Sequence, residues 1–252
     1  QARAGMPPWI GSVAWFALLT FVPLFLVEAR GFLTDTDYRS NQGFNTKTYG
    51  GILSVGHGLF ERVYGLATYT LEDVQIKDVQ DFAPENVQRQ AAQNEGKSLT
   101  SAVSAALVRD TRDSFAEPTR GNRTRLAATY AGGFLGADNN FTKYSAESSQ
   151  YWPLWWKLVG NVRGTFWYGD SFGDTPLLPV QERFFLGGAN TLRGFQNFTV
   201  SPTDPAGGEG LTGGNKAFFV NTELIFPLYE PMRMRGLLFF DIGNNLDERD
   251  DF

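Results

Sequence analysis

The chain has 252 residues, enough for one large domain, and its net charge of −5 argues against a general nucleic-acid-binding protein. It contains no cysteine, which excludes disulfide bonds and thiolate metal sites. Aromatic residues make up 15% of the chain, and there are 28 glycines. This composition suits an outer-membrane β-barrel, whose strands need apolar residues only at alternate positions, and a soluble β-sandwich is the alternative.

The first apolar run, residues 9–27, carries no charge over about the length of a transmembrane helix. Pro23 lies near its end, and Glu28 and Arg30 follow directly, which fits a helix poorly. The basic start and the small-residue cleavage site of a signal peptide are also poorly matched. We therefore prefer two apolar strands separated at Pro23, and we treat residues 1–23 as a segment of uncertain type that can supply a barrel strand.

From residue 24 onward, runs of residues alternate between apolar and charged side chains. In residues 62–72, for example, Val63 falls on an apolar face, whereas Arg62 and Glu72 fall on the other face. The runs reach the roughly 9–11 residues of a strand that crosses a bilayer, and lipid outside with water inside explains both faces. We predict an antiparallel transmembrane β-barrel segment of ten strands, at residues 12–21, 24–37, 47–57, 62–75, 99–110, 122–135, 140–151, 157–169, 216–228 and 232–244.

The links between these strands alternate in length, as in outer-membrane barrels, where long extracellular loops oppose short periplasmic turns. The long links are residues 38–46, 77–98 and 170–215, and the short turns are residues 58–61, 117–121 and 153–156. Residues 24–252 would then form one partial barrel domain. Within the second long link, residues 84–96 predict a short helix, with proline in the first turn and glycine at the end. That helix is polar nearly all round, which predicts a solvated surface helix.

The longest link contains the sequence ERFFLGGANTLRGFQ, residues 182–196, in which aromatic residues and glycines surround Arg193. Alternation puts Glu223 and Asp241 on the inward faces of the next two strands. An arginine folded into a barrel lumen loses hydration, and two carboxylates offer charge-assisted partners for it. The alternative is that Arg193 is solvated in a flexible loop and that both carboxylates line a wet pore.

Glycines and aromatic residues suit a loop that folds back against the barrel wall. Gly187, Gly188 and Gly194 allow tight turns and a close approach of the backbone to the wall. We expect Phe184 and Phe195 to pack the loop tip in place. The sequence thus predicts that the longest loop lies inside the lumen.

Three segments in this order resemble the outer-membrane protein assembly factor family, BamA and its relatives. They are residues 182–196, FVNTELIFPL at 219–228 and GLLFFDIGN at 236–244. In that family a long extracellular loop folds into the barrel and carries a V/L-R-G-F/Y motif, which corresponds here to Leu192, Arg193, Gly194 and Phe195. The next two strands of the family carry the inward glutamate and the aspartate that correspond to Glu223 and Asp241. The resemblance therefore implies that these two carboxylates brace the loop.

The resemblance also implies a function and partners. The family barrel has sixteen strands, follows periplasmic POTRA domains, and folds and inserts β-barrel proteins into the bacterial outer membrane. Its substrates would be unfolded outer-membrane proteins, and its partners would be periplasmic lipoproteins and the lipid bilayer, with no nucleic acid. About three strands at the C-terminal end and a comparable number at the start would lie outside this chain. Two rivals remain, a two-partner secretion transporter of the same superfamily and a general diffusion porin.

Motifs for bond chemistry are weak. His57 is the only histidine, so neither a histidine-based triad nor a multi-histidine metal site can be built. The glycine-rich residues 207–214 lack the Lys-Ser/Thr pair and the helix that follow a phosphate-binding loop. We therefore expect no enzymatic activity, no cofactor and no metal site.

Overall fold

A computed structural model describes residues 16–22, 25–37, 43–204 and 210–250. Ten antiparallel strands form one sheet, and each strand pairs with its neighbours along the chain. The strands are β1 (Phe16–Val22), β2 (Phe25–Asp37), β3 (Asn45–Phe60), β4 (Val63–Lys77), β5 (Lys97–Asp110), β6 (Gly121–Ala131), β7 (Phe141–Pro153), β8 (Val159–Ser171), β9 (Lys216–Tyr229) and β10 (Met234–Leu246). The predicted all-β antiparallel fold is confirmed.

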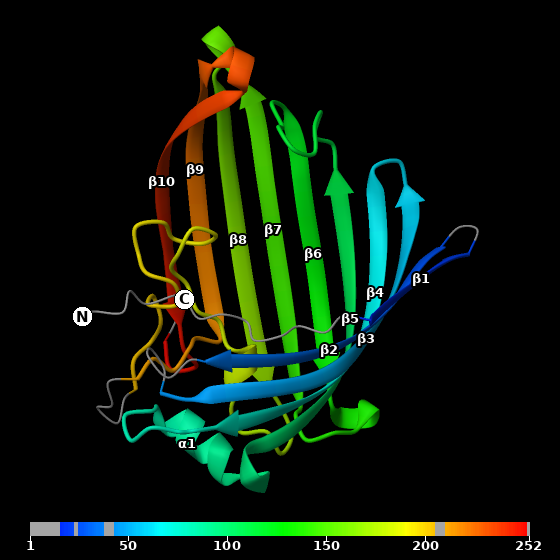
Figure 1. Ribbon diagram of the computed structural model, residues 1–252, viewed down its shortest axis with the longest axis vertical. Helices are drawn as coiled ribbons and strands as arrows, with labels where there is room; N and C mark the ends of the chain where they lie inside the picture. Colours follow the sequence, from blue (N-terminus) through cyan, green and yellow to red (C-terminus); the bar gives the residue numbers. More distant parts are fainter. Residues whose placement is uncertain (1–15, 23–24, 38–42, 205–209, 251–252) are drawn as a thin grey trace.

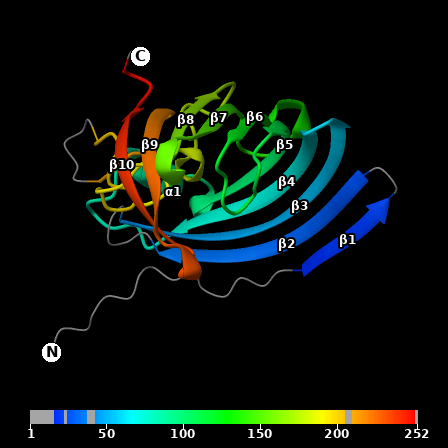
Figure 2. The same ribbon diagram turned by 90° about the horizontal axis from the view of Figure 1, so that it is seen from above.

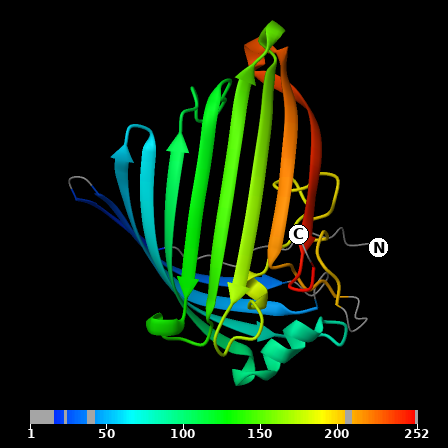
Figure 3. The same cartoon turned by 180° about the vertical axis from the view of Figure 1, so that it is seen from behind.

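The sheet is strongly curved and twisted (Figure 1). Seen from above, it forms a trough, and the loop between β8 and β9 lies on the concave side (Figure 2). Helix α1 (Glu85–Ala92) lies at one end of the strands, and the turns β7–β8 and β9–β10 lie at the other (Figures 1 and 3). Within the described ranges, β1 and β10 each pair on one side only, so the sheet is open.

The two faces of the sheet differ in polarity. On the concave face, the hydroxyl oxygens of Ser104 and Thr129 lie 2.8 Å apart across neighbouring strands and share a hydrogen bond. On the convex face of β10, Leu238, Phe240 and Ile242 are each more than half exposed. Apolar side chains that face outward along a strand suit a lipid-facing barrel wall, and the polar face suits a water-filled lumen.

Strand ends differ from the predicted ones by a few residues. The largest difference is at β6, which ends at Ala131 rather than at residue 135. Gly132 and Gly133 take positive φ angles of 75° and 55° there and begin a 3-10 turn, which breaks the strand.

The first apolar run contains a strand in its described part. Residues 16–22 form β1, in antiparallel pairing with β2, while residues 12–15 of the predicted first strand lie outside the described residues. The preference for strands over a helix thus agrees with β1 and β2. No helix in the described part of the chain is long and apolar enough to span a membrane.

The link between β5 and β6 is longer than the short turn predicted at residues 117–121. It comprises residues 111–120, and Asp113 organises it. The Asp113 carboxylate accepts hydrogen bonds from the backbone N–H and the hydroxyl of Thr119 at 2.9 and 2.5 Å. It also accepts one from the backbone N–H of Arg120 at 3.2 Å. These bonds hold a structured loop where the composition indicated only a turn.

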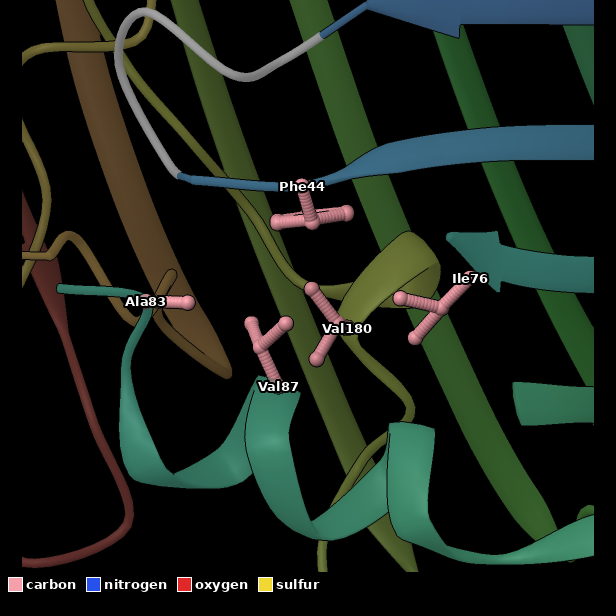
Figure 4. Close-up of a cluster of buried hydrophobic side chains, with 5 residues drawn as sticks. All are labelled: Phe44, Ile76, Ala83, Val87 and Val180. Atoms are coloured by element: carbon pink, nitrogen blue, oxygen red, sulfur yellow. The ribbon is translucent and has the colours of Figure 1, made fainter. Parts of the chain in front are cut away.

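Helix α1 forms within the predicted range, but the prediction of a solvated surface helix is wrong. Val87 is fully buried, in a cluster with Phe44, Ile76, Ala83 and Val180 (Figure 4). Gln90 donates from Nε2 to Gln181 Oε1 at 2.9 Å, and its Oε1 accepts from the backbone N–H of Val180 at 3.0 Å. Because Val180 and Gln181 belong to the β8–β9 loop, α1 packs against that loop. Asn86 adds a hydrogen bond from Nδ2 to the carbonyl oxygen of Thr212 at 3.1 Å, so one buried valine and a few polar contacts dock a largely polar helix.

Candidate functional site

The β8–β9 loop, residues 172–215, is attached to the concave wall by an apolar cluster. Leu186 and Leu192 of the loop are buried together with Ala217 and Phe219 of β9. Three further side chains are partly buried against this cluster: Trp167, Phe184 and Val200. Leu192, the first residue of the predicted motif, is 4% exposed and so fixes the position of its neighbour Arg193.

Arg193 meets both predicted carboxylates. Its Nε and Nη2 donate to the two carboxylate oxygens of Asp241 at 2.8 and 2.6 Å, which is a bidentate pair. Its Nη1 donates to Glu223 Oε1 at 2.5 Å. The backbone N–H of Arg193 donates to Asp241 as well, at 2.9 Å, so Asp241 binds both the main chain and the side chain of the loop.

The Arg193 site is largely shielded from water. The side chain of Asp241 is 4% exposed, that of Arg193 17% and that of Glu223 19%. The guanidinium carbon lies 4.1 Å from the ring centroid of Phe239, in cation–π geometry. Hydrogen bonds to Asp241, followed by those to Glu223, raise the pKa of Arg193 above its ordinary value, so the guanidinium stays charged.

A second layer of polar residues on β8 and β9 holds the site in place. Asn161 donates to the other oxygen of Glu223 at 3.0 Å. Asn221 donates to the backbone carbonyl of Thr191 at 2.7 Å and accepts from Arg163 Nε at 3.0 Å. The orientation of Glu223 and the path of the loop are thus both fixed by neighbouring wall residues.

The predicted glycines lie at backbone turns. Gly187 and Gly188 have φ angles of 108° and 90°, and a Cβ atom on Gly187 would lie 2.2 Å from the carbonyl oxygen of Gln196. Gly194 also has a positive φ, of 90°, but no atom lies within 4 Å of its Cβ position, so backbone conformation alone favours glycine there. The loop could not follow this path with larger residues at the first two positions.

The two predicted aromatic anchors behave differently. The ring centroid of Phe184 lies 5.5 Å from that of Trp167, which belongs to wall strand β8. Phe195 is 59% exposed, so the prediction that it packs the loop tip is wrong.

Sequence reasoning missed a second arginine in the same loop. Arg183 is 7% exposed, and it donates to the carbonyl oxygens of Leu178 and Gly213 at 3.0 and 2.9 Å. It also donates to Glu248, beyond β10, at 2.5 Å. Burial lowers the pKa of Arg183, and the charge of Glu248 opposes that change. Arg183 therefore joins the two ends of the loop to the segment that follows β10.

The residue before it forms another wall contact. Glu182 accepts a hydrogen bond from Lys143 Nζ on β7 at 2.8 Å, and both side chains are at least three-quarters buried. Asn245 of β10 donates to the carbonyl oxygen of Phe184 at 2.7 Å. In the sequence, only the adjacent opposite charges of Glu182 and Arg183 hint at these contacts. Together these contacts hold the loop against the wall.

Comparisons with known proteins agree with this architecture. A protein-family profile described as the Omp85 superfamily domain matches residues 11–252. The outer membrane protein assembly factor BamA of Nitratidesulfovibrio vulgaris is 32% identical over 186 residues, which cover 73% of this chain and 22% of that protein. The human sorting and assembly machinery component 50 homolog is 34% identical over 124 residues, which cover 47% of this chain and 26% of that protein. The chain thus spans about a quarter of the length of these relatives.

A solved structure has the same fold. The crystal structure of BamA from Haemophilus ducreyi lacking POTRA domains 1–3 matches with a TM-score of 0.76 and 20% sequence identity. The match covers 88% of this chain and 47% of that chain. The ten strands therefore correspond in fold to about half of that larger chain.

Proposed function

Because this chain belongs to the Omp85 superfamily, we propose that it supplies part of the barrel of a machine that folds and inserts β-barrel proteins into an outer membrane. The observation that carries the proposal is the clamp of Arg193 on Asp241 and Glu223, which fixes the long loop inside the concave wall. The names of the relatives, an assembly factor and a sorting and assembly component, support the same function.

The proposed role of the clamp is mechanical, and it requires no bond chemistry, cofactor or metal. A strand entering lipid needs its backbone groups satisfied, which a neighbouring strand edge can provide. That exchange needs a wall that keeps its curvature while strands add and leave. The loop is bound to β9 and β10 through buried charges, so it couples these two strands. If the strands moved apart, Arg193 would lose a carboxylate partner in a largely buried site.

We infer that the ten strands from β1 to β10 work as one section of a larger barrel. Within the described residues, β1 and β10 each have an edge without a partner strand, and such edges are unstable in a bilayer. Further strands on both sides would satisfy them. The β4–β5 and β8–β9 loops then lie at the extracellular end, and the short turns at the periplasmic end.

For location and partners, we favour a bacterial outer membrane. The match to the bacterial relative covers 73% of this chain, against 47% for the human one, and the solved structure is bacterial. The substrates would be unfolded outer-membrane proteins. Periplasmic lipoproteins would be the accessory partners, by analogy with the family.

The test is reconstitution of the full-length protein in liposomes with an unfolded β-barrel substrate. Arg193→Ala is expected to slow substrate folding at least about tenfold, because it leaves two largely buried carboxylates without their cation. Glu223→Ala and Asp241→Ala are expected to slow it as well, because each removes one of the two wall strands to which Arg193 is bound. Arg62→Ala, at an exposed turn, is the matched control. Wild-type folding rates in all three variants would contradict the role of the clamp. A large, steady conductance of the wild-type protein would instead indicate a diffusion porin.

A further inference from the structure

A small cavity lies on the concave face of the sheet, beside the start of the β8–β9 loop's wall contacts. Its volume is about 260 Å³. Strands β4 to β8 supply all of its lining except Phe184, which belongs to the loop. Neither Arg193 nor its two carboxylate partners line the cavity, so it is separate from the Arg193 site.

One side of the cavity is a row of hydroxyl groups. Thr68, Ser104 and Thr129 lie opposite one another on β4, β5 and β6. The hydroxyl oxygens of Ser104 and Thr129 share a hydrogen bond at 2.8 Å. Thr68 shares one with Ser54 of β3 at 3.1 Å. Because a hydroxyl donates one hydrogen bond and accepts two, each of these pairs keeps a donor and acceptors for a ligand.

The hydroxyl row ends at a lysine whose charge is already balanced. Lys143 lies opposite Thr129 on β7, and it donates to Glu182 at 2.8 Å. Its ammonium nitrogen also lies 5.0 Å from the ring centroid of Phe184. Lys143 thus closes one end of the cavity without adding net charge to it.

Arg125 supplies the charge at the other end of the cavity. It lies four residues before Thr129 on β6, so both side chains point to the concave face, with their Cα atoms about 13 Å apart. Arg125 makes no hydrogen bond or ion pair with any described residue. Glu147, which lies opposite it on β7, binds Arg123 instead, at 3.3 Å. The guanidinium therefore has donors available for an anion that enters the cavity.

The floor between these two ends is small and apolar. Leu66, Ala106 and Ala127 lie opposite one another, two residues from the hydroxyl row on each strand. The rings of Trp167 and Phe184 form a side wall, with their centroids 5.5 Å apart. A matching ligand has one anionic group, several hydroxyl groups and a small apolar face.

We propose that this cavity binds a small acidic sugar, a single ring that carries hydroxyl groups and one carboxylate or phosphate. The anionic group would bind Arg125 through charge-assisted hydrogen bonds. The ring hydroxyls would bind the hydroxyl row, and a C–H face of the ring would lie on the alanine floor. The volume is just below the range of drug-sized ligand sites, which limits the ligand to about one ring. The site is independent of the assembly function proposed above.

The test is calorimetric titration of the full-length protein in detergent micelles with glucuronate. Arg125→Gln is expected to weaken binding at least about tenfold, because it removes the charge-assisted hydrogen bonds. Since Arg125 has no partner among the described residues, this substitution breaks no contact that holds the fold. Thr129→Val keeps the shape of the side chain but removes its hydroxyl, and it should weaken binding about fivefold. Arg62→Gln, at an exposed turn outside the cavity, is the matched control and should bind like wild type.

A comparison of ligands on the wild-type protein tests each part of the site. Glucose lacks the anionic group and should bind at least about tenfold more weakly than glucuronate, and cyclohexanecarboxylate lacks the hydroxyls and should bind about fivefold more weakly. Tighter binding of glucose 6-phosphate than of glucuronate would identify the anionic group as a phosphate, and the reverse order would identify it as a carboxylate.

Three outcomes would overturn the proposal: equal binding of glucose and glucuronate, equal binding of cyclohexanecarboxylate and glucuronate, or wild-type affinity of Arg125→Gln. Because binding is measured without a substrate protein, a protein that binds glucuronate yet fails to assemble substrates contradicts only the assembly function.

Discussion

Two arginines hold the same loop, and their partners differ in kind. Arg193 is bound by carboxylates of two wall strands, whereas Arg183 is bound by two backbone carbonyls and by Glu248. Arg193 keeps 17% of its side chain exposed and Arg183 only 3%. The first site attaches the loop to the barrel, and the second holds the loop's own two ends together.

The difference shows what each kind of partner provides. Carboxylates neutralise the guanidinium, so Arg193 is stable in a largely buried site even where some water remains. Carbonyl oxygens supply partial charges only, so Arg183 depends on one carboxylate and on the fixed path of the backbone. The Arg183 site should therefore fail more completely when it is altered.

The largest effect is expected for Arg183→Met. The substitution keeps much of the volume but leaves two buried carbonyls and Glu248 without their donor, at a cost of about 3 to 5 kcal/mol of unfolding free energy. Urea titration of the reconstituted protein, followed by tryptophan fluorescence, measures this loss. Arg62→Met, at a cation that is 59% exposed in the β3–β4 turn, is the control. An equal loss in both variants would contradict the special role of the buried arginine.

A smaller loss, about 2 kcal/mol, is expected for Arg193→Lys, since an ammonium cannot form the bidentate pair with Asp241 while it also reaches Glu223. Asp241→Asn should cost more than Glu223→Gln, because Asp241 accepts three hydrogen bonds from Arg193 and Glu223 accepts one. Limited proteolysis of the β8–β9 loop ranks the variants. If Glu223→Gln were the more damaging change, the assignment of Asp241 as the main partner would be wrong.

The same contrast explains which features were predictable from the sequence. Period-two alternation identified the strands and the inward faces of Glu223 and Asp241, because side-chain direction in a strand follows from position alone. The partners of Arg183 include carbonyl oxygens, which every residue has, so no residue type marks them. The burial of Arg183 depends on the path that the loop takes along the inner face of the wall.

Helix α1 and the β5–β6 link were misjudged for a related reason. The burial of Val87 depends on a loop about a hundred residues away in the sequence, which local polarity cannot reveal. The ordered form of residues 111–120 depends on the hydrogen bonds of Asp113, which a count of turn-forming residues does not capture. Both errors concern contacts between loops, whereas the strands themselves are set by their own pattern.

An intermediate effect is expected for Val87→Ala, which removes two buried methyl groups at a cost of about 1.5 kcal/mol. Because α1 packs on the β8–β9 loop near Val180, hydrogen exchange should quicken in both segments while the Arg193 site keeps its protection. Ala92→Gly, at the end of α1, weakens the helix without touching the cluster and serves as the control. Faster exchange around Arg193 as well would mean that the two anchors of the loop are one cooperative unit.

The smallest effect on stability is expected from protonation of Asp113. Like Arg183, Asp113 is bound by backbone groups, but these groups lie only six and seven residues away in the sequence. The Thr119 hydroxyl, followed by backbone N–H groups, holds the pKa of Asp113 well below its ordinary value of 3.8. Because the folded pKa is depressed, the stabilisation is present above pH 3.8 and is lost as pH falls toward the folded value. Amides of residues 111–120 should thus lose protection on acidification, after correction for intrinsic exchange. In Asp113→Asn that pH dependence should be absent, and its persistence would mean that another group controls the link.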